Sequence, residues 1–269
     1  MFDWGDGHYE RTATTLLSVS DEVVAHLAPT TGTRIVDVGC GTGNGALAAA
    51  RRGATLTGID PAERLLGVAS KRAAHEGLVV DWRAGSGGAL PLGDHSQDAA
   101  IAIFSIIFAP DARDCIRELR RVVRPGGRIV FTTWMAEGPL NDSYEAMMRV
   151  ASEVRPPSDE SADEAPPSEE LLWGDGNWLS KMWPGVDLTL VRRTHRMTAP
   201  SAAAWFEDQE TNHPAWRAMR RGLADIEGAW ARVKEASVEV LAAASAPGVE
   251  GWAIDSHYWL VDVTLPDAG

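Results

Sequence analysis

The segment from Thr33 to Pro61 constrains the fold more than any other part of the chain. It contains a short apolar run over 34–38, three closely spaced glycines, an alanine-rich segment over 44–52, and a second apolar run that ends at Asp60. A continuous apolar run is typical of a strand buried on both faces, and a helix between two such strands supplies the crossover that parallel pairing needs. The sequence therefore predicts a strand–turn–helix–strand unit of a parallel sheet, with Gly53 capping the helix.

The glycines and the acid that follows them indicate a nucleotide site. Glycine has no Cβ, so a ligand can lie directly against the backbone N–H groups of Gly39, Gly41 and Gly43. In an open parallel sheet, ligands bind beyond the carboxyl ends of the strands, and an acid about 20 residues after the glycines can accept hydrogen bonds from a ribose. Asp60 stands at that spacing, although Asn44 replaces the last glycine of the G-x-G-x-x-G pattern.

Three motifs in order resemble those of the class I S-adenosylmethionine (AdoMet) methyltransferases. They are V-D-V-G-C-G-T-G at 36–43, G-I-D-P at 58–61 and L-R-R-V-V-R-P-G-G-R-I-V-F at 119–131, and together they cover roughly residues 30–135. The opening at 2–10, F-D-W-G-D-G-H-Y-E, is similar to that of a bacterial small-molecule branch of the family. The resemblance implies a doubly wound α/β fold with a mostly parallel seven-stranded sheet, an antiparallel edge and helical lid insertions.

The resemblance also implies AdoMet as cofactor, S-adenosylhomocysteine (AdoHcy) as product, and a set of contacts. In the family the N-terminal arm folds over the cofactor, which would place Tyr9 near the methionine carboxylate; a frayed terminus is the alternative. The family usually has an Asp for the adenine amino group, but Ser86 stands there, and a hydroxyl accepts that bond less strongly. The expected cofactor residues are Tyr9, Gly39, Cys40, Gly41, Asn44, Asp60, Pro61, Leu65, Gly85, Ser86, Gly87, Phe104 and Ser105.

The chain reads as one domain over 1–269, with an AdoMet-binding core at 30–135 and lid insertions at 136–185 and 198–250. Patterning predicts helices over 11–28, 61–75, 111–123, 177–183, 201–213 and 215–244, and later strands over 78–84, 99–104, 128–134, 186–197 and 253–265. Asp111 is the expected N-cap of its helix. The acid-rich and proline-rich stretch at 153–170 is expected to be a mobile loop.

Most of the large aromatic residues lie in the second half of the chain. Nine of the eleven tryptophans fall at or after Trp134. Flat aromatic surfaces suit a planar or polycyclic substrate, whereas the plainer alternative is an extra helical layer that needs its own core. The candidate substrate residues are Phe108, Trp134, Tyr144, Trp173, Trp205, Trp216 and Trp259, with Phe104 and Phe108 as a wall between cofactor and substrate.

Methyl transfer needs a nucleophile held in line with the methyl group in a site that excludes water. A general base helps only if the nucleophile must lose a proton, and histidine is the side chain best suited near pH 7. The candidates are His213, His257 and His8, each with a structural role as the alternative. Asp111 and Asp114 have the spacing of a solvated, capped helix face, and no metal site is predicted.

Composition narrows the partners. The formal net charge is −13, which disfavours nucleic acid and anionic lipid as substrates because phosphate contacts need clustered Lys and Arg. No apolar run approaches the roughly 20 residues of a membrane span, and the N-terminus lacks signal-peptide features. The two cysteines form no metal or disulfide motif. A cytoplasmic monomer or homodimer acting on a free small molecule is expected.

The sequence therefore predicts methyl transfer from AdoMet to an O or N atom of a small, planar or aromatic molecule. Richness in Ala, Gly and Arg suggests a bacterial source and a role in natural-product biosynthesis. Three alternatives stay open: C-methylation of a quinone-type ring, a non-catalytic AdoMet-binding protein, and a nicotinamide-dependent oxidoreductase. The last would be expected to show G-x-G-x-x-G and a catalytic Tyr-Lys pair, and the sequence shows neither.

Overall fold

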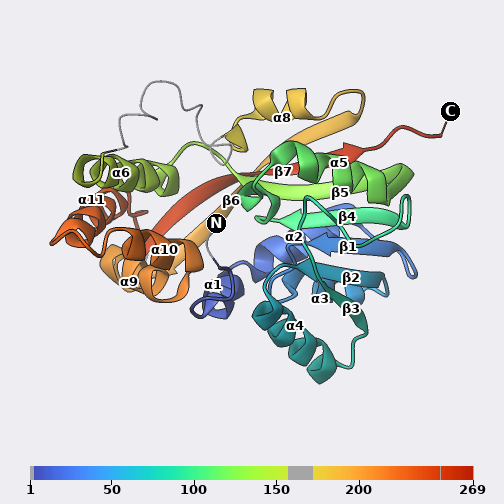
Figure 1. Ribbon diagram of the computed structural model, residues 1–269, viewed down its shortest axis with the longest axis horizontal. Coiled ribbons are helices and arrows are strands. Elements are labelled where there is room, and N and C mark those ends of the chain that lie inside the picture. Colours follow the sequence, from blue (N-terminus) through green and yellow to red (C-terminus); the bar gives the residue numbers. More distant parts are fainter. Residues whose placement is uncertain (1–2, 157–171, 249, 269) are drawn as a thin grey trace.

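A computed structural model describes residues 3–156, 172–248 and 250–268, and every structural statement below concerns these residues (Figure 1). The segment expected as a mobile acidic loop, 153–170, lies outside them apart from its first few residues, as does Phe2 of the N-terminal motif. No helix among the described residues combines the length and the apolar character needed to cross a bilayer.

The sheet has seven strands in the order β3-β2-β1-β4-β5-β7-β6. They are β1 (Arg34–Val38), β2 (Thr55–Asp60), β3 (Val80–Ala84), β4 (Gln97–Ile103), β5 (Val123–Trp134), β6 (Asp187–Ala199) and β7 (Trp252–Thr264). The first five strands are mutually parallel, and β7 runs antiparallel to both β5 and β6. The expected mostly parallel sheet, closed by an antiparallel pairing at one side, is confirmed.

The described helices fall into two groups. Around the parallel strands are α2 (Leu17–Leu27), α3 (Asn44–Ala50), α4 (Glu63–Glu76) and α5 (Ala112–Val122), with α8 (Gly176–Met182) nearby. At the other end of the molecule, on the left of Figure 1, are α6 (Pro139–Val154), α9 (Ala202–Asn212), α10 (Pro214–Gly222) and α11 (Ala229–Ala243). A short α1 (Tyr9–Thr15) lies between the two groups, and a 3-10 turn, η1 (Ile106–Phe108), follows β4.

Each group has its own core, and the second group, α6, α9, α10 and α11, corresponds to the insertions expected as a lid and is called the lid below. The main core is built from the continuous apolar runs of the central strands, such as Ile35 and Ile101, which are fully buried. A separate cluster in the lid contains Met147, Phe206 and Val233 from α6, α9 and α11. The lid helices therefore pack on one another as well as on the sheet.

The helix expected over 11–28 is interrupted at Leu16, which separates α1 from α2. The hydroxyls of Thr14 and Thr15 donate hydrogen bonds to the carbonyls of Arg11 and Thr12, three residues back. Such bonds compete with the helical ladder, and the Leu16 N–H correspondingly bonds three residues back to Ala13. The break leaves α1 free to turn toward α9.

Two other boundaries differ from expectation in the second half. The single helix expected over 215–244 is divided into α10 and α11, because Gly222 ends the first and Gly228, with a φ of 71°, precedes the second. The interval expected only as an insertion contains α6, which begins at Pro139 directly after Gly138. Proline at the first helical position is a usual helix start, so this signal was present in the sequence.

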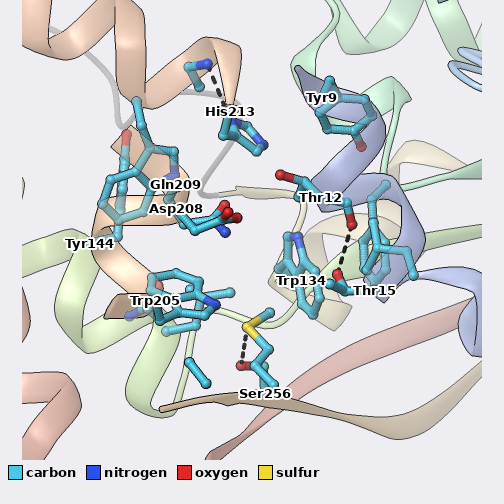
Figure 2. Close-up of a pocket in the computed structure, with 18 of the residues that line it drawn as sticks. Tyr9, Thr12, Thr15, Trp134, Tyr144, Trp205, Asp208, Gln209, His213 and Ser256 are labelled. Carbon is cyan, nitrogen blue, oxygen red and sulfur yellow. Dashed lines mark hydrogen bonds between the residues drawn. The ribbon is translucent and has the colours of Figure 1, made fainter. Parts of the chain in front are cut away.

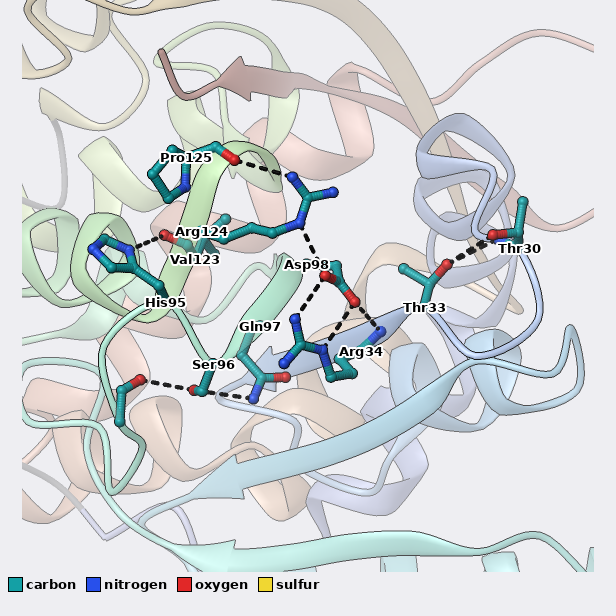
Figure 3. Close-up of polar contacts among 11 residues, drawn as sticks. Thr30, Thr33, Arg34, His95, Ser96, Gln97, Asp98, Val123, Arg124 and Pro125 are labelled. Atoms are coloured by element: carbon teal, nitrogen blue, oxygen red, sulfur yellow. Dashed lines mark hydrogen bonds and ion pairs between the residues drawn. The ribbon is translucent and has the colours of Figure 1, made fainter. Parts of the chain in front are cut away.

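The amino ends of the central strands are joined by one carboxylate (Figure 3). Asp98 on β4 accepts hydrogen bonds from the guanidinium groups of Arg34 on β1 and Arg124 on β5, at 2.9 Å from the nearest nitrogen of each. These bonds hold the pKa of the Asp98 carboxyl well below its usual range. The pairing of β4 with β5 shifts register between Gln97 and Ala99, so the Pro-Gly-Gly sequence at 125–127 forms an irregularity within β5. This end of the sheet lies opposite the candidate site.

Candidate active site

The turn after β1 has the geometry of a ligand cradle. Gly39, Gly41 and Gly43 all have positive φ angles, of 66°, 52° and 84°. The backbone N–H groups of Gly39 and Cys40 donate to the carbonyl of Ile59 on β2, which fixes the turn at the carboxyl ends of two strands. A methyl group added at Gly39 would lie 2.4 Å from Cβ of Ser105, so no side chain fits there. A small pocket of about 40 Å³ opens beside this turn.

Asp60 lies beside the turn, as the sequence predicts. Its Oδ2 accepts a hydrogen bond from the Gly41 N–H and its Oδ1 from the Ala62 N–H, both at 2.8 Å. Burial raises the pKa of this carboxyl, although both backbone bonds favour the ionised form. Among the described residues its hydrogen-bond partners are backbone amides rather than a cation, so the carboxylate keeps lone pairs available for a ligand.

A second carboxyl group, which the sequence analysis did not single out, lies under the same turn. Asp37 on β1 is 2% exposed and accepts a hydrogen bond from the Ala46 N–H in the first turn of α3 at 2.8 Å. Burial, with a smaller contribution from the nearby charge of Asp60, raises its pKa to about 7. Two buried carboxyl groups beside one small pocket favour a ligand that carries positive charge.

Asn44, which replaces the last glycine of the motif, anchors the turn to its neighbours. Its Nδ2 donates to the carbonyl of Ala13 on α1, and its Oδ1 accepts from Arg72 on α4, both at 2.7 Å. Arg72 also donates to the carbonyl of Thr42 at 2.7 Å. The side chain of Asn44 is therefore engaged by the protein, which leaves its backbone for the predicted cofactor contact.

The other predicted cofactor residues lie around the carboxyl ends of β2, β3 and β4. The Gly85 N–H donates to the backbone carbonyl of Asp60, and exposed Ser86 begins a tight turn closed by the Ala89 N–H. Ser105 donates its hydroxyl to the carbonyl of Val38 at 2.6 Å. Pro61 is exposed, whereas Leu65 is buried. A Cβ atom added at Gly87 would lie 3.0 Å from Sγ of Cys115.

Trp82 on β3 was not predicted and shapes the back of the turn. A Cβ at Gly58 on β2 would lie 2.4 Å from its indole, and one at Gly43 would lie 2.8 Å from it. The indole therefore lies across two glycines, one in the strand and one in the turn. The glycine inside β2 was the available signal, because glycine within a strand often marks a close approach by another group.

A large cavity adjoins the cradle on the lid side (Figure 2). Its volume is about 1290 Å³, and it is enclosed by α1, α6, α9, α10 and the ends of β4 to β7. Tyr9 lines both this cavity and the small pocket, and its ring lies over Gly41. Burial, with a smaller contribution from the Asp60 charge, raises the pKa of the Tyr9 phenol to about 12, so it stays protonated.

Most predicted substrate residues meet in this cavity. It is lined by Phe104, Phe108, Trp134, Tyr144, Trp205 and Trp216. Phe104, whose φ is 48°, stacks on Trp134 with ring centroids 3.9 Å apart and an interplanar angle of 6°. This stacked pair forms a rigid wall at the end of the cavity nearest β4 and β5.

Trp173 and Trp259 lie outside the cavity, in the layer between the sheet and α8. Trp173 is 1% exposed and packs edge-on against Phe131 and Trp178. Trp259 donates its indole N–H to the Gly174 carbonyl at 3.0 Å. Both belong to the main core or pack against it, which is the role that the sequence analysis kept as the alternative for each tryptophan.

The three histidines considered as bases occupy different environments. His8 is 70% exposed at its side chain, lies 3.3 Å from Glu10 and does not line the cavity. His257 lines the cavity and its Nδ1 lies 3.0 Å from the Thr194 hydroxyl. His213 lines it as well and caps α10, because its Nδ1 accepts a hydrogen bond from the Ala215 N–H at 3.2 Å.

The capping bond constrains the chemistry of His213. A nitrogen that accepts a backbone N–H carries no proton, so the neutral ring must carry its proton on Nε2 and present a donor there. Burial lowers the pKa of His213 to about 4, which keeps the ring neutral. In this arrangement His213 is a hydrogen-bond donor to the cavity rather than a proton acceptor.

Asp208 and Gln209 were not predicted and belong to the cavity wall formed by α9. Both line the cavity together with Trp205, and the three side chains point into it in Figure 2. The helical spacing of Trp205, Asp208 and Gln209 was the available signal, because residues three and four apart share a helix face. The cavity-facing side of that helix could not be identified without the lid packing.

Asp111 and Asp114 have partners on their own helix, as expected for a capped, solvated helix face. Asp111 accepts hydrogen bonds from the Arg113 and Asp114 N–H groups as the N-cap of α5, and Asp114 pairs with Arg117. No group of three or more His, Cys, Asp or Glu side chains in the described part of the chain is arranged to hold a metal ion.

The fold and the site together define a class I methyltransferase architecture: a mostly parallel seven-stranded sheet with a glycine turn after its first strand and an acid at the end of its second. Solved structures with this fold include the YcgJ protein of Bacillus subtilis, at a TM-score of 0.60 and 18% identity over 93% of this chain and 100% of that one. A putative methyltransferase of Bacillus halodurans aligns at a TM-score of 0.59 and 19% identity, over 93% of this chain and 99% of that one.

Sequence comparison agrees with the fold. Residues 36–131 match the family described as a methyltransferase domain. An uncharacterised protein of Mycobacterium tuberculosis is 32% identical over 67% of this chain and 63% of its own length. Methyltransferase GfsG of Streptomyces halstedii is 35% identical over 48% of each chain. The chain thus spans about half to two thirds of the length of these relatives, and its match to the methyltransferase-domain family lies in residues 36–131.

Proposed function

We propose that the protein transfers a methyl group from AdoMet to an O or N atom of a small molecule bound in the large cavity. The observation that carries the proposal is the junction at Tyr9, which lines both the small pocket at the glycine turn and the 1290 Å³ cavity. A methyl donor held at the turn would thereby face a substrate held under the lid.

The residues at the turn fit the cofactor. Its ribose hydroxyls would be held by Asp60, whose carboxylate is fixed by two backbone amides, and its amino-acid portion would lie against Gly39 and Gly41, where no Cβ intervenes. The buried carboxyl groups of Asp37 and Asp60 suit a positively charged ligand. Bound AdoMet supplies an electrophilic methyl group, and the chain's contribution is binding, orientation and exclusion of water.

The chain closes the site through its N-terminal arm, defined here as residues 3–8. Trp4 packs edge-on against Tyr9 and Phe108, with ring centroids 5.4 and 4.9 Å apart. Asp6 is held by Arg217 and Arg221 of α10, and the carbonyl of Gly5 accepts from Arg64 of α4 at 2.7 Å. The arm thus bridges the core and the lid beside the junction, where it would keep water from the reacting atoms.

The acceptor atom and biological setting stay proposals. The match to methyltransferase GfsG of Streptomyces halstedii agrees with the expected bacterial source. A demethylmenaquinone methyltransferase of Tropheryma whipplei is 34% identical over 46% of this chain, which keeps carbon methylation as the second candidate. Mass spectrometry and NMR of a product would distinguish O or N from C transfer.

Calorimetric titration with AdoHcy tests the cofactor assignment. The wild-type protein should bind one equivalent, and Asp60→Ala should weaken binding at least about tenfold, because one charge-assisted hydrogen bond to a ligand contributes roughly 1.5–3 kcal/mol. The control is Asp81→Ala, which removes an exposed acid of the adjacent strand β3. Equal affinity in wild type and Asp60→Ala would show that the ribose assignment is wrong, and absence of binding to wild type would refute the proposed function.

A further inference from the structure

The apolar part of the large cavity is unusually rich in methionine. Five of the seven methionines of the chain line it, namely Met135, Met147, Met148, Met197 and Met219. Methionine is unbranched and flexible, so it adapts to irregular and non-planar ligands. The volume of about 1290 Å³ also exceeds the roughly 300–1,000 Å³ of ordinary ligand pockets.

The aromatic residues of the cavity do not form a slot for a flat ring. One face of Trp134 is covered by Phe104, which stacks on it at 3.9 Å. Trp205 and Trp216 meet each other edge to face, at an interplanar angle of 87°. A slot for a planar molecule would need parallel, open ring faces, so these contacts favour a bulky aliphatic ligand over the planar one expected from the tryptophan count.

The charges of the cavity disfavour an anionic ligand. Two arginines line it, and both are paired: Arg11 lies 3.1 Å from Asp208, and Arg196 lies 2.7 Å from Asp255. No lysine appears among its described lining residues, and His213 is held neutral by its buried position. A phosphate or carboxylate would therefore have to displace an existing ion pair.

One wall of the cavity carries polar groups whose hydrogen-bonding capacity is not fully used. Gln209 is 7% exposed, and its side-chain amide forms no hydrogen bond with the described residues. The known hydrogen bonds of Asp208, from Arg11 and Asn212, both use Oδ1, so Oδ2 is left as an acceptor. In Figure 2 both side chains project from α9 into the cavity, with His213 on the same side and Thr12 opposite.

A buried polar group without a partner, such as the Gln209 amide, marks a position where a ligand supplies the partner. Gln209 offers a donor and an acceptor, Asp208 an acceptor and His213 an Nε2–H donor, and a hydroxyl group both donates and accepts. The hydroxyl oxygen of Thr12 is also buried without a partner among the described residues, on the facing wall. The set matches an uncharged hydroxyl group better than a cation or an anion.

We propose that the substrate is a neutral, largely aliphatic alcohol, bound with its hydrocarbon body among the methionines and its hydroxyl group at Asp208, Gln209 and His213. This inference rests on the proposed function, and it selects oxygen as the acceptor atom and a non-planar substrate class. The new O–CH₃ bond would form as the S–CH₃ bond of AdoMet breaks, and the hydroxyl proton would pass to Oδ2 of Asp208, the free acceptor at this position. Gln209 and Asp208 act as specificity-determining residues because they recognise the hydroxyl rather than the hydrocarbon.

Matched probes test the inference without knowledge of the natural substrate. The probes are 1-decanol, decyl methyl ether, which lacks the O–H donor, decanoate, which is anionic, and the planar 2-methyl-1,4-naphthoquinone. Binding is followed by the fluorescence of the cavity tryptophans, with and without AdoHcy. We expect decanol to bind at least about tenfold more tightly than the ether and more tightly than the other two probes, because a buried donor or acceptor left unpaired is penalised.

Variants assign that preference to α9. Gln209→Leu and Asp208→Asn should each bring the ratio of decanol to ether affinity toward one while ether affinity changes little, and Glu207→Gln, an exposed neighbour on the same helix, should keep the ratio. Circular dichroism verifies that each variant is folded. If one of the two α9 variants does not fold, the other still tests the inference. Equal affinity for decanol and its ether, a preference that survives both substitutions, or tightest binding of the naphthoquinone would overturn the inference. If the wild-type protein does not bind AdoHcy, the proposed function is refuted. The relative affinities of the four probes still test whether the cavity prefers an alcohol.

Discussion

The absence of a side chain at Gly39 allows the backbone conformation of the glycine turn after β1. Its φ of 66° is unfavourable for residues that have a side chain. A Cβ atom added at Gly39 would also lie 2.4 Å from the Cβ atom of Ser105, in the loop that follows β4. Glycine is therefore required at position 39 for two separate reasons: the backbone conformation and the lack of space for a Cβ atom. Each can be measured by substitution.

Gly39→Ala should lower the free energy of unfolding by about 2–4 kcal/mol, the sum of the left-handed backbone and overpacking penalties. Ser105→Gly should relieve the packing part in the double variant, whereas Ser105→Ala, which keeps the Cβ, should not. Urea denaturation of the variants measures the coupling. If Gly39→Ala lowers the free energy of unfolding equally with Ser, Ala or Gly at position 105, then Ser105 does not exclude a side chain at position 39.

Asp37 should make binding of the proposed cofactor dependent on pH. Its pKa of about 7 means that the carboxyl is largely neutral at pH 6 and ionised at pH 8. A cationic ligand favours the ionised form, so binding below pH 7 must release a proton, and affinity should rise from pH 6 to pH 8 by up to about tenfold per pH unit. The rise should level off once the carboxyl is ionised.

Calorimetry with AdoMet at pH 6, 7 and 8, in buffers of different ionisation enthalpy, measures both affinity and proton release. Asp37→Asn should flatten the dependence, and the surface variant Asp81→Asn should leave it unchanged. A wild-type affinity that is independent of pH, with no proton release, would contradict the role given to Asp37.

The residue scale also shows what sequence can and cannot place. Gly39, Gly41 and Asp60 could be placed at one turn because their positions depend on local backbone geometry along one strand–turn–helix–strand unit. Asp208 and Gln209 could not, because their role depends on which face of α9 the lid presents to the cavity. Residue type alone likewise did not separate Trp205, which lines the cavity, from Trp173, which is 1% exposed in the core.

At the scale of elements, the N-terminal arm is held to the lid by partly exposed ion pairs. Asp6 joins it to α10 through Arg217 and Arg221, and hydrogen bonds from these two arginines lower its pKa to about 2. The carboxylate side chain is 22% exposed, so solvent screens these pairs and their contribution is modest. The arm should therefore open more readily than the sheet.

Asp6→Asn should increase hydrogen exchange in the arm and α1 by several-fold while exchange in β1 and β4 stays the same. The total loss of stability should be about 1 kcal/mol or less, because the ion pairs are partly exposed. Asp3→Asn is the matched control, since among the described residues the Asp3 side chain accepts its hydrogen bond from the nearby Gly5 N–H and not from α10. Faster exchange in both variants, or in neither, would show that Asp6 does not hold the N-terminal arm to α10.

Element boundaries followed the sequence where one residue type decides them. Asp111 caps α5 and Gly77 ends α4 with a φ of 67°, as capping preferences predict. The break at Leu16 depends on two threonine hydroxyls that bond three residues back, and periodicity alone does not report such competition. Helix α6 was missed although Gly138 and Pro139 mark its start.

At the scale of the whole molecule, the account depends on two cavities that share Tyr9. The walls of the larger one come from α1, the ends of the strands and the lid helices, which are far apart in the sequence. The sequence predicted the sheet and the turn because they follow one repeating pattern. It did not define the lid cavity, because that shape arises only when α6, α9 and α10 pack against the open end of the sheet.

A crystal structure of the protein with AdoHcy tests this arrangement most directly. We predict density for the nucleoside at the glycine turn, with the ribose at Asp60 and the sulfur facing the cavity between Tyr9 and Phe104. Density for the ligand elsewhere, or a turn closed by protein with Asp60 directed away from the ribose, would contradict the account.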